Sequence, residues 1–215
     1  LKRILPKTVY QNSTLIGDLV KPKDIVLVIV AIDSEAPEGR LIFPQNQTIR
    51  DAIDNHSIAV VVREDELDDF LKTGVTPALA ITDSQIFKSV TRKLPETIPL
   101  TSFSILFARL KGDFAAYLRG TPCISNLKDE DEVLILESCT HQTSCDDIGR
   151  VKIPKLLQEF TGKKLNFRVV SGLTPLPDNI SSFALVVQCG GCMVTRKQLL
   201  NRLYPFIKEG IPVTN

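Results

Sequence analysis

Several residue types and motifs that mark common functional classes are scarce or missing in this sequence. Its 215 residues include no Trp, one Met and two His, and Lys plus Arg number 26 against 25 for Asp plus Glu. The resulting net charge of +1 gives no overall field that favours nucleic acid or an anionic membrane surface. No apolar run approaches the ~20 residues that span a bilayer, and no signal-peptide pattern opens the chain. We therefore expect neither nucleic acid nor a membrane as a partner.

Motifs for nucleotide and hydrolytic chemistry are missing as well. The sequence contains no G-x-x-x-x-G-K-[ST] phosphate loop, no G-x-S-x-G nucleophile turn and no H-E-x-x-H zinc motif. The 5 cysteines are an odd number in a chain of globular composition, which argues against a disulfide framework and for a reducing compartment. We expect no enzymatic activity from this chain, and a cytoplasmic location.

What the sequence does contain is a regular alternation of strand and helix patterns. Residues 24–32 (DIVLVIVAI) form a continuous β-branched run, typical of a strand buried on both faces of a parallel sheet. The predicted fold class is α/β, with two consecutive βα units and mostly parallel sheets. Further strands are predicted at 58–62, 78–81, 133–136, 165–170 and 184–187, and helices at 48–55, 64–72, 151–160 and 195–207, with another helix capped by Asp83.

The alternation falls into two parts with a different pattern between them. Residues 101–119 have apolar side chains at helical spacing, interrupted by Gly112, and are followed by a turn-rich stretch. We place a helical connector at 101–125, between a first domain at 1–100 and a second at 126–215. An open parallel sheet has edge strands whose N–H and C=O groups must be covered or paired. We therefore expect a homodimer formed through the first domain.

Cysteines in two distant segments form the main candidate site. Cys139 follows the predicted strand 133–136, and Cys189 and Cys192 follow the strand 184–187 as a C-G-G-C sequence. Open α/β sheets place their ligands at the carboxyl ends of strands, so the fold would bring these thiolates together. Thiolates suit iron-sulfur clusters, zinc or copper. The two glycines allow positive φ, and a T-x-x-Q capping box at Thr195 predicts a helix N-terminus close behind.

The remaining candidate residues leave alternatives open. His141 and Glu137 flank Cys139 at two residues' distance, so each is a candidate fourth ligand, while a hydrogen bond, cap or ion pair would also explain them. Cys123 and Cys145 are interpreted as packed small hydrophobes. A structural zinc domain and a dithiol oxidoreductase of the C-x-x-C type are the alternatives to an iron-sulfur protein.

Five stretches of the sequence resemble HydF, the GTPase scaffold family that matures FeFe-hydrogenase. The resemblance covers essentially the whole chain, and the C-x-H followed by C-x-x-C is its most specific part. The matching stretches are 36–45 (APEGRLIFPQ), 47–51 (QTIRD), 137–142 (ESCTHQ), 145–150 (CDDIGR) and 189–192 (CGGC). Family members carry a GTPase domain, then a dimerisation domain, then a cluster-binding domain; the last two would be the domains 1–100 and 126–215.

The resemblance implies a function and a set of ligands. Cys139, Cys189 and Cys192 would bind a 4Fe-4S cluster whose fourth iron is open to an exchangeable ligand. The protein would be a scaffold or carrier that receives a di-iron precursor as cargo and passes it to the hydrogenase. Its partners would be a second copy of itself, the FeFe-hydrogenase and the radical-SAM maturation enzymes. GTP would bind only in the GTPase domain, which lies outside this chain.

Overall fold

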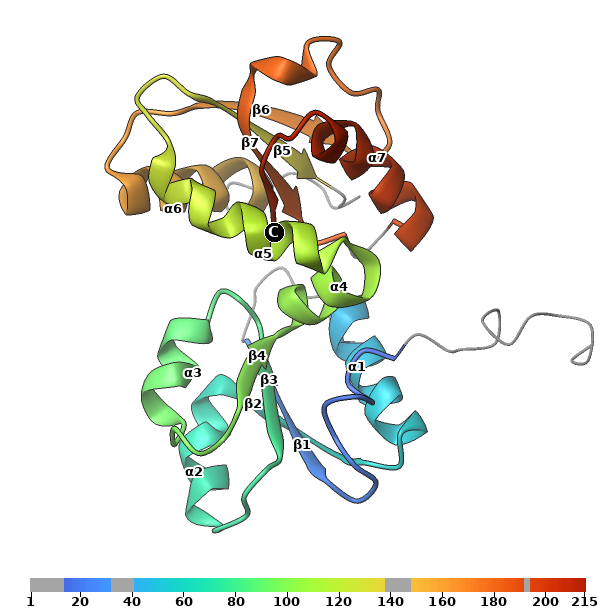
Figure 1. Cartoon of the computed structure of the whole chain (residues 1–215). Helices are drawn as coiled ribbons and strands as arrows, with labels where there is room; N and C mark the ends of the chain where they lie inside the picture. Colours follow the sequence, from blue (N-terminus) through green and yellow to red (C-terminus); the bar gives the residue numbers. More distant parts are fainter. Residues whose placement is uncertain (1–13, 32–40, 138–147, 192–193) are drawn as a thin grey trace, which may run out of the picture. The chain divides into compact units, whose positions relative to one another are not determined.

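The computed structural model describes residues 14–31, 41–137, 148–191 and 194–215 (Figure 1). The chain forms two compact units that divide between Leu106 and Phe107. Each unit contains one four-stranded sheet in which every strand pairing is parallel. The predicted α/β fold with parallel sheets is therefore confirmed. No helix in the described ranges is long and apolar enough to cross a bilayer.

The first unit places its most apolar strand in the interior of the sheet. Its strand order is β2-β1-β3-β4, and residues 26–29 of β1 are completely buried. The sheet consists of β1 (Ile25–Val30), β2 (Ile58–Arg63), β3 (Leu79–Thr82) and β4 (Leu100–Ser102). The helices are α1 (Phe43–Asp54), α2 (Leu67–Lys72) and α3 (Phe87–Lys93), with a 3-10 turn at Glu64–Glu66 before α2.

The second unit repeats this strand order as β6-β5-β7-β8. Its strands are β5 (Glu132–Glu137), β6 (Asn166–Ser171), β7 (Phe183–Cys189) and β8 (Val213–Thr214). Helix α4 (Phe103–Lys111) contains the division point between the units and is followed by α5 (Phe114–Gly120), α6 (Ile153–Thr161) and α7 (Arg196–Lys208). Short helical turns occupy Thr121–Asn126, Ile148–Lys152 and Ile180–Ser182.

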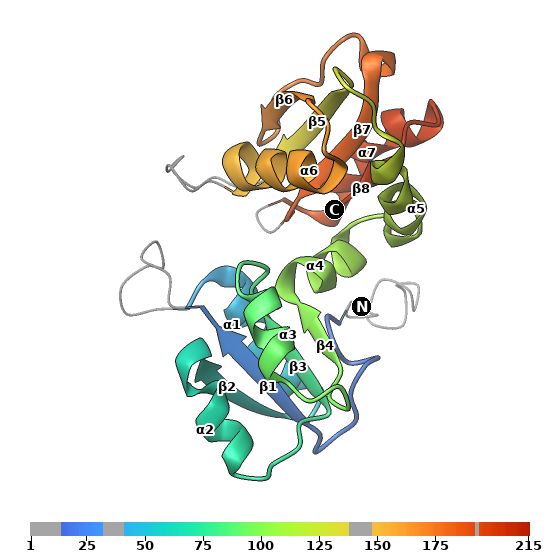
Figure 2. The ribbon, with the colours of Figure 1, turned by 90° about the vertical axis from the view of Figure 1, so that its left-hand side faces the viewer.

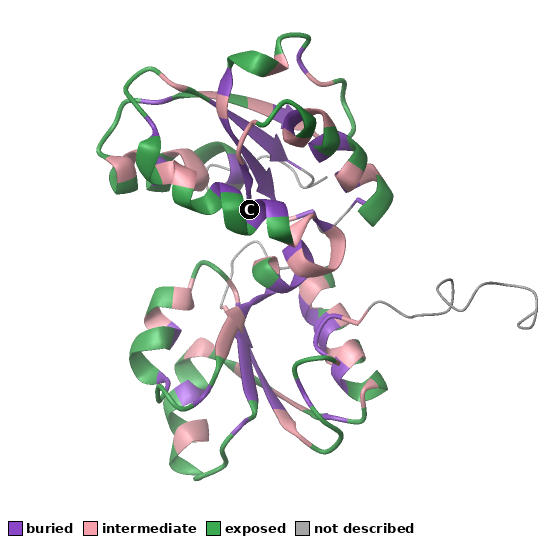
Figure 3. Cartoon of the chain, viewed as in Figure 1, coloured by how far each residue is buried: buried purple, intermediate pink, exposed green. Residues whose placement is uncertain are grey.

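Alternate residues of β5 face two different layers of helices. Leu134 and Leu136 pack in one apolar cluster with Leu203 of α7, whereas Val133 and Ile135 pack in another with Leu157 of α6. Figure 2 shows α6 and α7 on opposite faces of this sheet. The interior strands β1, β3, β5 and β7 are the most buried elements, as expected for strands covered on both faces, whereas the residues of edge strand β2 are exposed or half-buried (Figure 3).

The region predicted as helical at 101–119, with an interruption at Gly112, has that interruption, but its first residues form a strand. That strand is β4, and two helices follow, separated by Gly112 and Asp113. A Cβ on Gly112 would lie 2.4 Å from the ring of Tyr117, and the Asp113 carboxylate caps α5 by accepting from the N–H of Ala116 at 2.9 Å. A tight approach and a new cap thus end one helix and begin the next.

Two predicted caps have different outcomes. Asp83 does not cap α3; its carboxylate accepts instead from the N–H of Ala31 at 3.1 Å and from Nε2 of Gln45 at 3.3 Å. The Thr195 capping box is confirmed, because its side chain accepts from the N–H of Gln198 at the start of α7. The Thr195 cap depends only on the spacing of neighbouring residues, so the sequence could predict it. The hydrogen-bond partners of Asp83 come from distant parts of the sequence, and only the fold brings them close.

Candidate metal centre

The carboxyl ends of three strands in the second unit meet in one row. Glu137 of β5 is in register with Ser171 of β6 on one side and with Cys189 of β7 on the other. Residues paired in this way direct their side chains to the same face of a sheet. Cys139 lies two residues beyond Glu137 in the sequence, so the segments that carry Cys139 and Cys189 leave the sheet from neighbouring strands.

Cys189 is the described member of the predicted ligand set. It is the last residue of β7, is 7% exposed, and packs in the same apolar cluster as Val187 and Leu157. The predicted backbone geometry after it is confirmed, since Gly190 and Gly191 have φ of 62° and 75°. A Cβ on Gly191 would also lie 2.6 Å from Cδ1 of Leu199, so this position favours glycine on two grounds.

Positive groups lie close to Gly191 and Val194, which follow Cys189 in the sequence. Nζ of Lys111 donates to the carbonyls of Gly191 and Val194, each at 3.0 Å. The N-terminus of α7 begins immediately afterwards, capped by Thr195. An ammonium group and the positive end of a helix dipole both favour negative charge nearby, which is the charge that thiolate ligands bring.

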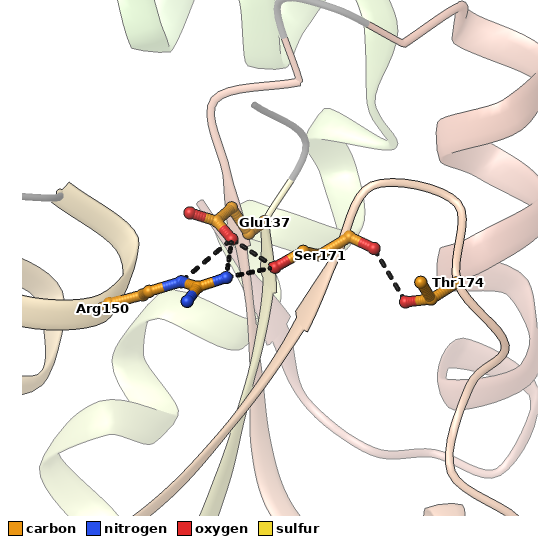
Figure 4. A network of polar contacts seen from close by, with 4 residues as sticks. All are labelled: Glu137, Arg150, Ser171 and Thr174. Atoms are coloured by element: carbon orange, nitrogen blue, oxygen red, sulfur yellow. Dashed lines mark hydrogen bonds and ion pairs between the residues drawn. The ribbon is translucent and has the colours of Figure 1, made fainter. Parts of the chain in front are cut away.

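Glu137 is a buried residue held by a polar network with Arg150 and Ser171, which are more exposed (Figure 4). Its side chain is 4% exposed, and Oε2 accepts a short hydrogen bond from the Ser171 hydroxyl. Arg150 donates to the same oxygen from Nη2 at 3.3 Å and from Nε at 3.4 Å, and to Ser171 Oγ at 2.9 Å. In the sequence, Glu137 and Arg150 stand immediately before and after segment 138–149, and the ion pair joins them. A buried carboxylate needs such partners, and Glu137 has them from two elements.

Several predicted site residues lie outside the described ranges. These are Cys139, His141 and Cys192, together with Cys145, which was predicted not to be a ligand. Within the described ranges, no three or more His, Cys, Asp or Glu side chains gather as a metal-binding group. Cys123 is half-buried in the turn Thr121–Asn126, where its Sγ lies 3.7 Å from the carbonyl oxygen of Arg119.

Sequence patterns alone did not single out Lys111, Ser171 or Arg150 for this region. Lys111 contacts carbonyls 80 and 83 residues away, and Ser171 meets Glu137 across 34 residues. Only Arg150 belongs to a stretch that carried the family resemblance. For the other two residues, no local spacing could have predicted these contacts, because the fold alone creates them.

The described residues fit a thiolate-bound inorganic cluster. A soft thiolate donor stands at the carboxyl end of a strand, and two glycines in the left-handed region leave the adjacent backbone without side chains. Glu137, at the end of the neighbouring strand, lies two residues before Cys139 in the sequence, and the nearby helix dipole and ammonium group suit an anionic group. Cys139, Cys189 and Cys192 would be the residues that hold it.

Both units of the chain are similar to domains of a known family. The profile of the Hydrogen maturase F dimerization domain matches residues 15–112, and that of the Hydrogen maturase F tetramerization domain matches residues 115–215. No curated protein sequence matches significantly. Two solved structures have a low similarity to the chain. One is a periplasmic ribose ABC transporter from Conexibacter woesei, with 11% sequence identity and a TM-score of 0.30 over 89% of this chain and 70% of that one. The other is an ABC transporter solute binding protein from Burkholderia multivorans, with 14% sequence identity and a TM-score of 0.24 over 89% of this chain and 84% of that one.

Proposed function

The chain belongs to the hydrogen maturase F family, and from this premise we propose that it is a scaffold that binds a 4Fe-4S cluster through Cys139, Cys189 and Cys192. Profiles of two family domains together extend from residue 15 to residue 215, which supports a role in hydrogenase maturation. The cluster and its ligands are the further step. The observation that carries this step is the register of Glu137 with Cys189, which starts both cysteine segments from adjacent strand ends.

A scaffold needs one coordination position that can exchange its ligand. Three thiolates on a four-iron cluster leave one iron for another donor, and His141 and Glu137 are the candidates from the sequence. The Glu137 carboxylate already accepts from Arg150 and Ser171, which favours His141 over Glu137 as the exchangeable donor. In this proposal a di-iron precursor is the cargo, and FeFe-hydrogenase and the radical-SAM maturation enzymes are the partners. GTP would act only through a domain that precedes this chain.

Self-association is supported by the descriptions of both matching domains. We assign the dimer contact to the outer side of β2, the edge strand of the sheet among the described residues. Ile58 is 53% exposed and Val61 is 42% exposed on this strand, although both are apolar. An exposed apolar edge strand with unpaired backbone groups is a surface that a second copy can cover.

Replacing single cysteines tests the ligand assignment. Cys139→Ala, Cys189→Ala and Cys192→Ala should each abolish stable cluster binding after anaerobic reconstitution, because no neighbouring group replaces a thiolate bound to iron. Cys123→Ala and Cys145→Ala are the matched controls and should keep wild-type iron and sulfide content. The measurement is iron, sulfide and zinc per chain, together with the EPR spectrum of the reduced protein. Iron loss in the Cys145 variant alone would overturn the assignment, and zinc without sulfide in the wild type would favour a structural zinc site.

A further inference from the structure

One arginine of the second unit is buried without a counter-charge among the described residues. Arg202 lies on α7, near Leu199 and Leu203 in the sequence, and is 7% exposed. Its Nη1 donates to the carbonyl oxygen of Thr174 at 2.9 Å, whereas Nε and Nη2 are buried and have no hydrogen-bond partner in the described part of the chain. Burial lowers the pKa of the Arg202 guanidinium, and no described carboxylate offsets this effect. An arginine keeps its proton in a protein, so a positive charge remains in the interior.

The two unpartnered nitrogens form the edge of the guanidinium that recognises oxyanions. A guanidinium is planar, and its Nε and Nη2 lie side by side, so two oxygens of one carboxylate or phosphate can accept from them together. In the same unit, Arg150 directs these same two atoms to Oε2 of Glu137. A buried charge costs much less when an anion pairs with it. The free edge of Arg202 therefore has the charge and the geometry of an oxyanion site.

Arg202 contacts the chain just beyond the carboxyl end of a strand. Thr174, whose carbonyl it binds, follows Ser171, the last residue of β6, by three positions. The Thr174 hydroxyl donates back to the Ser171 carbonyl at 2.7 Å, which closes a short turn (Figure 4). Residues 173–175 of this turn are exposed. Ligands of open α/β sheets bind beyond the carboxyl ends of the strands, so the place and the unpaired charge indicate the same role.

We propose that Arg202 binds a small ligand through its carboxylate or phosphate group, between α7 and the turn 172–175. Two oxygens of this group accept from Nε and Nη2, while Nη1 keeps its bond to the Thr174 carbonyl. The exposed turn moves aside to admit the ligand, because the guanidinium itself has no contact with solvent at these two atoms. The site does not use the proposed cluster ligands, and it does not depend on the cluster.

The binding of an oxyanion can be tested by unfolding metal-free protein in chloride buffer with added phosphate or acetate. An anion that binds only the folded chain stabilises it, and at ten times its dissociation constant it lowers the unfolding equilibrium constant about tenfold. The ionic strength is held constant with chloride, and the protein concentration is the same throughout. We expect the urea midpoint of the wild type to rise with one of the two anions. A rise with phosphate alone identifies a phosphate ligand, and a rise with acetate alone identifies a carboxylate.

Substitutions of Arg202 decide whether the effect belongs to this site. Arg202→Met should lose the response to the anion and should be more stable than wild type in chloride, because it removes an unpaired buried charge. Arg202→Lys keeps a charge but lacks the planar fork, so it should lose most of the response as well, and it serves if Arg202→Met does not fold. Lys197→Met is the matched control, because Lys197 is exposed on the same helix, and it should respond as the wild type does.

Three results would overturn the proposal. The first is a wild type that responds to neither anion, and the second is an equal response in wild type and Arg202→Met. The third is a loss of stability in chloride on changing Arg202 to Met, which would mean that the charge already has a partner within the chain.

Discussion

The two units share one topology and differ in what they place at the carboxyl ends of their strands. In both, the second strand of the unit pairs with the first, and the third and fourth follow on the other side. At the first sheet, the Thr82 hydroxyl donates to the carbonyl of Ile29 at 3.1 Å, and the Asp83 carboxylate accepts from the N–H of Ala31. The second ends in Glu137, Ser171 and Cys189. Both sets of strand ends thus carry hydrogen-bonded polar groups, and the second also carries the Cys189 thiol.

The lateral edges of the two sheets differ as well. Edge strand β2 of the first sheet exposes Ile58 and Val61, whereas edge strand β6 of the second exposes Asn166 and Arg168. Polar and charged side chains on an edge oppose pairing with another chain, and apolar ones permit it. This contrast is why the proposed dimer contact lies on β2, in the part of the chain that matches the family's dimerization domain.

The largest expected effect comes from adding charge to β2. Ile58→Lys together with Val61→Lys would set like charges opposite each other across a two-fold contact, so the dissociation constant should rise at least ~100-fold. The molar mass of the particle from light scattering should fall by half, while any association through the second unit remains.

A charge change on the other sheet edge controls for this experiment. Arg168→Glu on β6 should leave the mass unchanged, because that edge already carries polar residues. If the doubly substituted β2 protein kept its wild-type mass and the β6 variant lost it, the contrast between the two edges would be wrong.

A pair of glycines gives a sharper comparison at a single backbone geometry. Gly191 and Gly74 have φ of 75° and 76°, but a Cβ would meet Leu199 at 2.6 Å in the first case and nothing within 4 Å in the second. We expect Gly74→Ala to lower the free energy of unfolding by about 1 kcal/mol, from backbone strain alone. Gly191→Ala should lower it by about 3 kcal/mol, because overpacking against Leu199 adds to the strain.

Urea unfolding followed by circular dichroism measures both glycine variants. Each is compared with wild type at the same protein concentration, since self-association shifts apparent stability. Equal losses for the two variants would mean that the surroundings of Gly191 relax freely. In that case crowding would not be a reason for the second glycine of the C-G-G-C sequence.

The sequence predicted the elements that have regular apolar patterns, including the short strand β3, and missed the two shortest strands of the described sheets. The runs that became β1 and β2 were recognisable because each contains at least five consecutive apolar residues. The run that became β5 contains four. Strands β4 and β8 have three and two residues, too few to show a period of two. Helix α1 begins at Phe43, five residues before its predicted start, because Pro44 suits the first turn of a helix.

The backbone around Cys189 was predictable for similar reasons, whereas the ligand set Cys139, Cys189 and Cys192 stays a prediction. A strand that ends in cysteine and continues into two glycines predicted both the position of Cys189 and the positive φ values that follow it. The contacts of Lys111 with two carbonyls and of Glu137 with Ser171 depend on how strands and helices meet in space. Such contacts leave no signal in local spacing, and so they could be found only once the fold was known.

The smallest expected effect on stability concerns Tyr117 of α5, which packs in an apolar cluster of the second unit. The Tyr117 hydroxyl is buried there without a hydrogen-bond partner among the described residues, and burial raises the pKa of Tyr117 well above its usual value. Above pH ~10 the unfolded chain ionises this tyrosine while the folded chain keeps it neutral, so stability falls as pH rises. Tyr117→Phe should change the free energy of unfolding by less than ~1 kcal/mol at pH 7 and reduce the loss between pH 9 and about 11. Tyr204→Phe is the matched control, because Tyr204 is exposed on α7. A fall with pH that is equally steep in wild type and Tyr117→Phe would show that other groups govern alkaline unfolding of this unit.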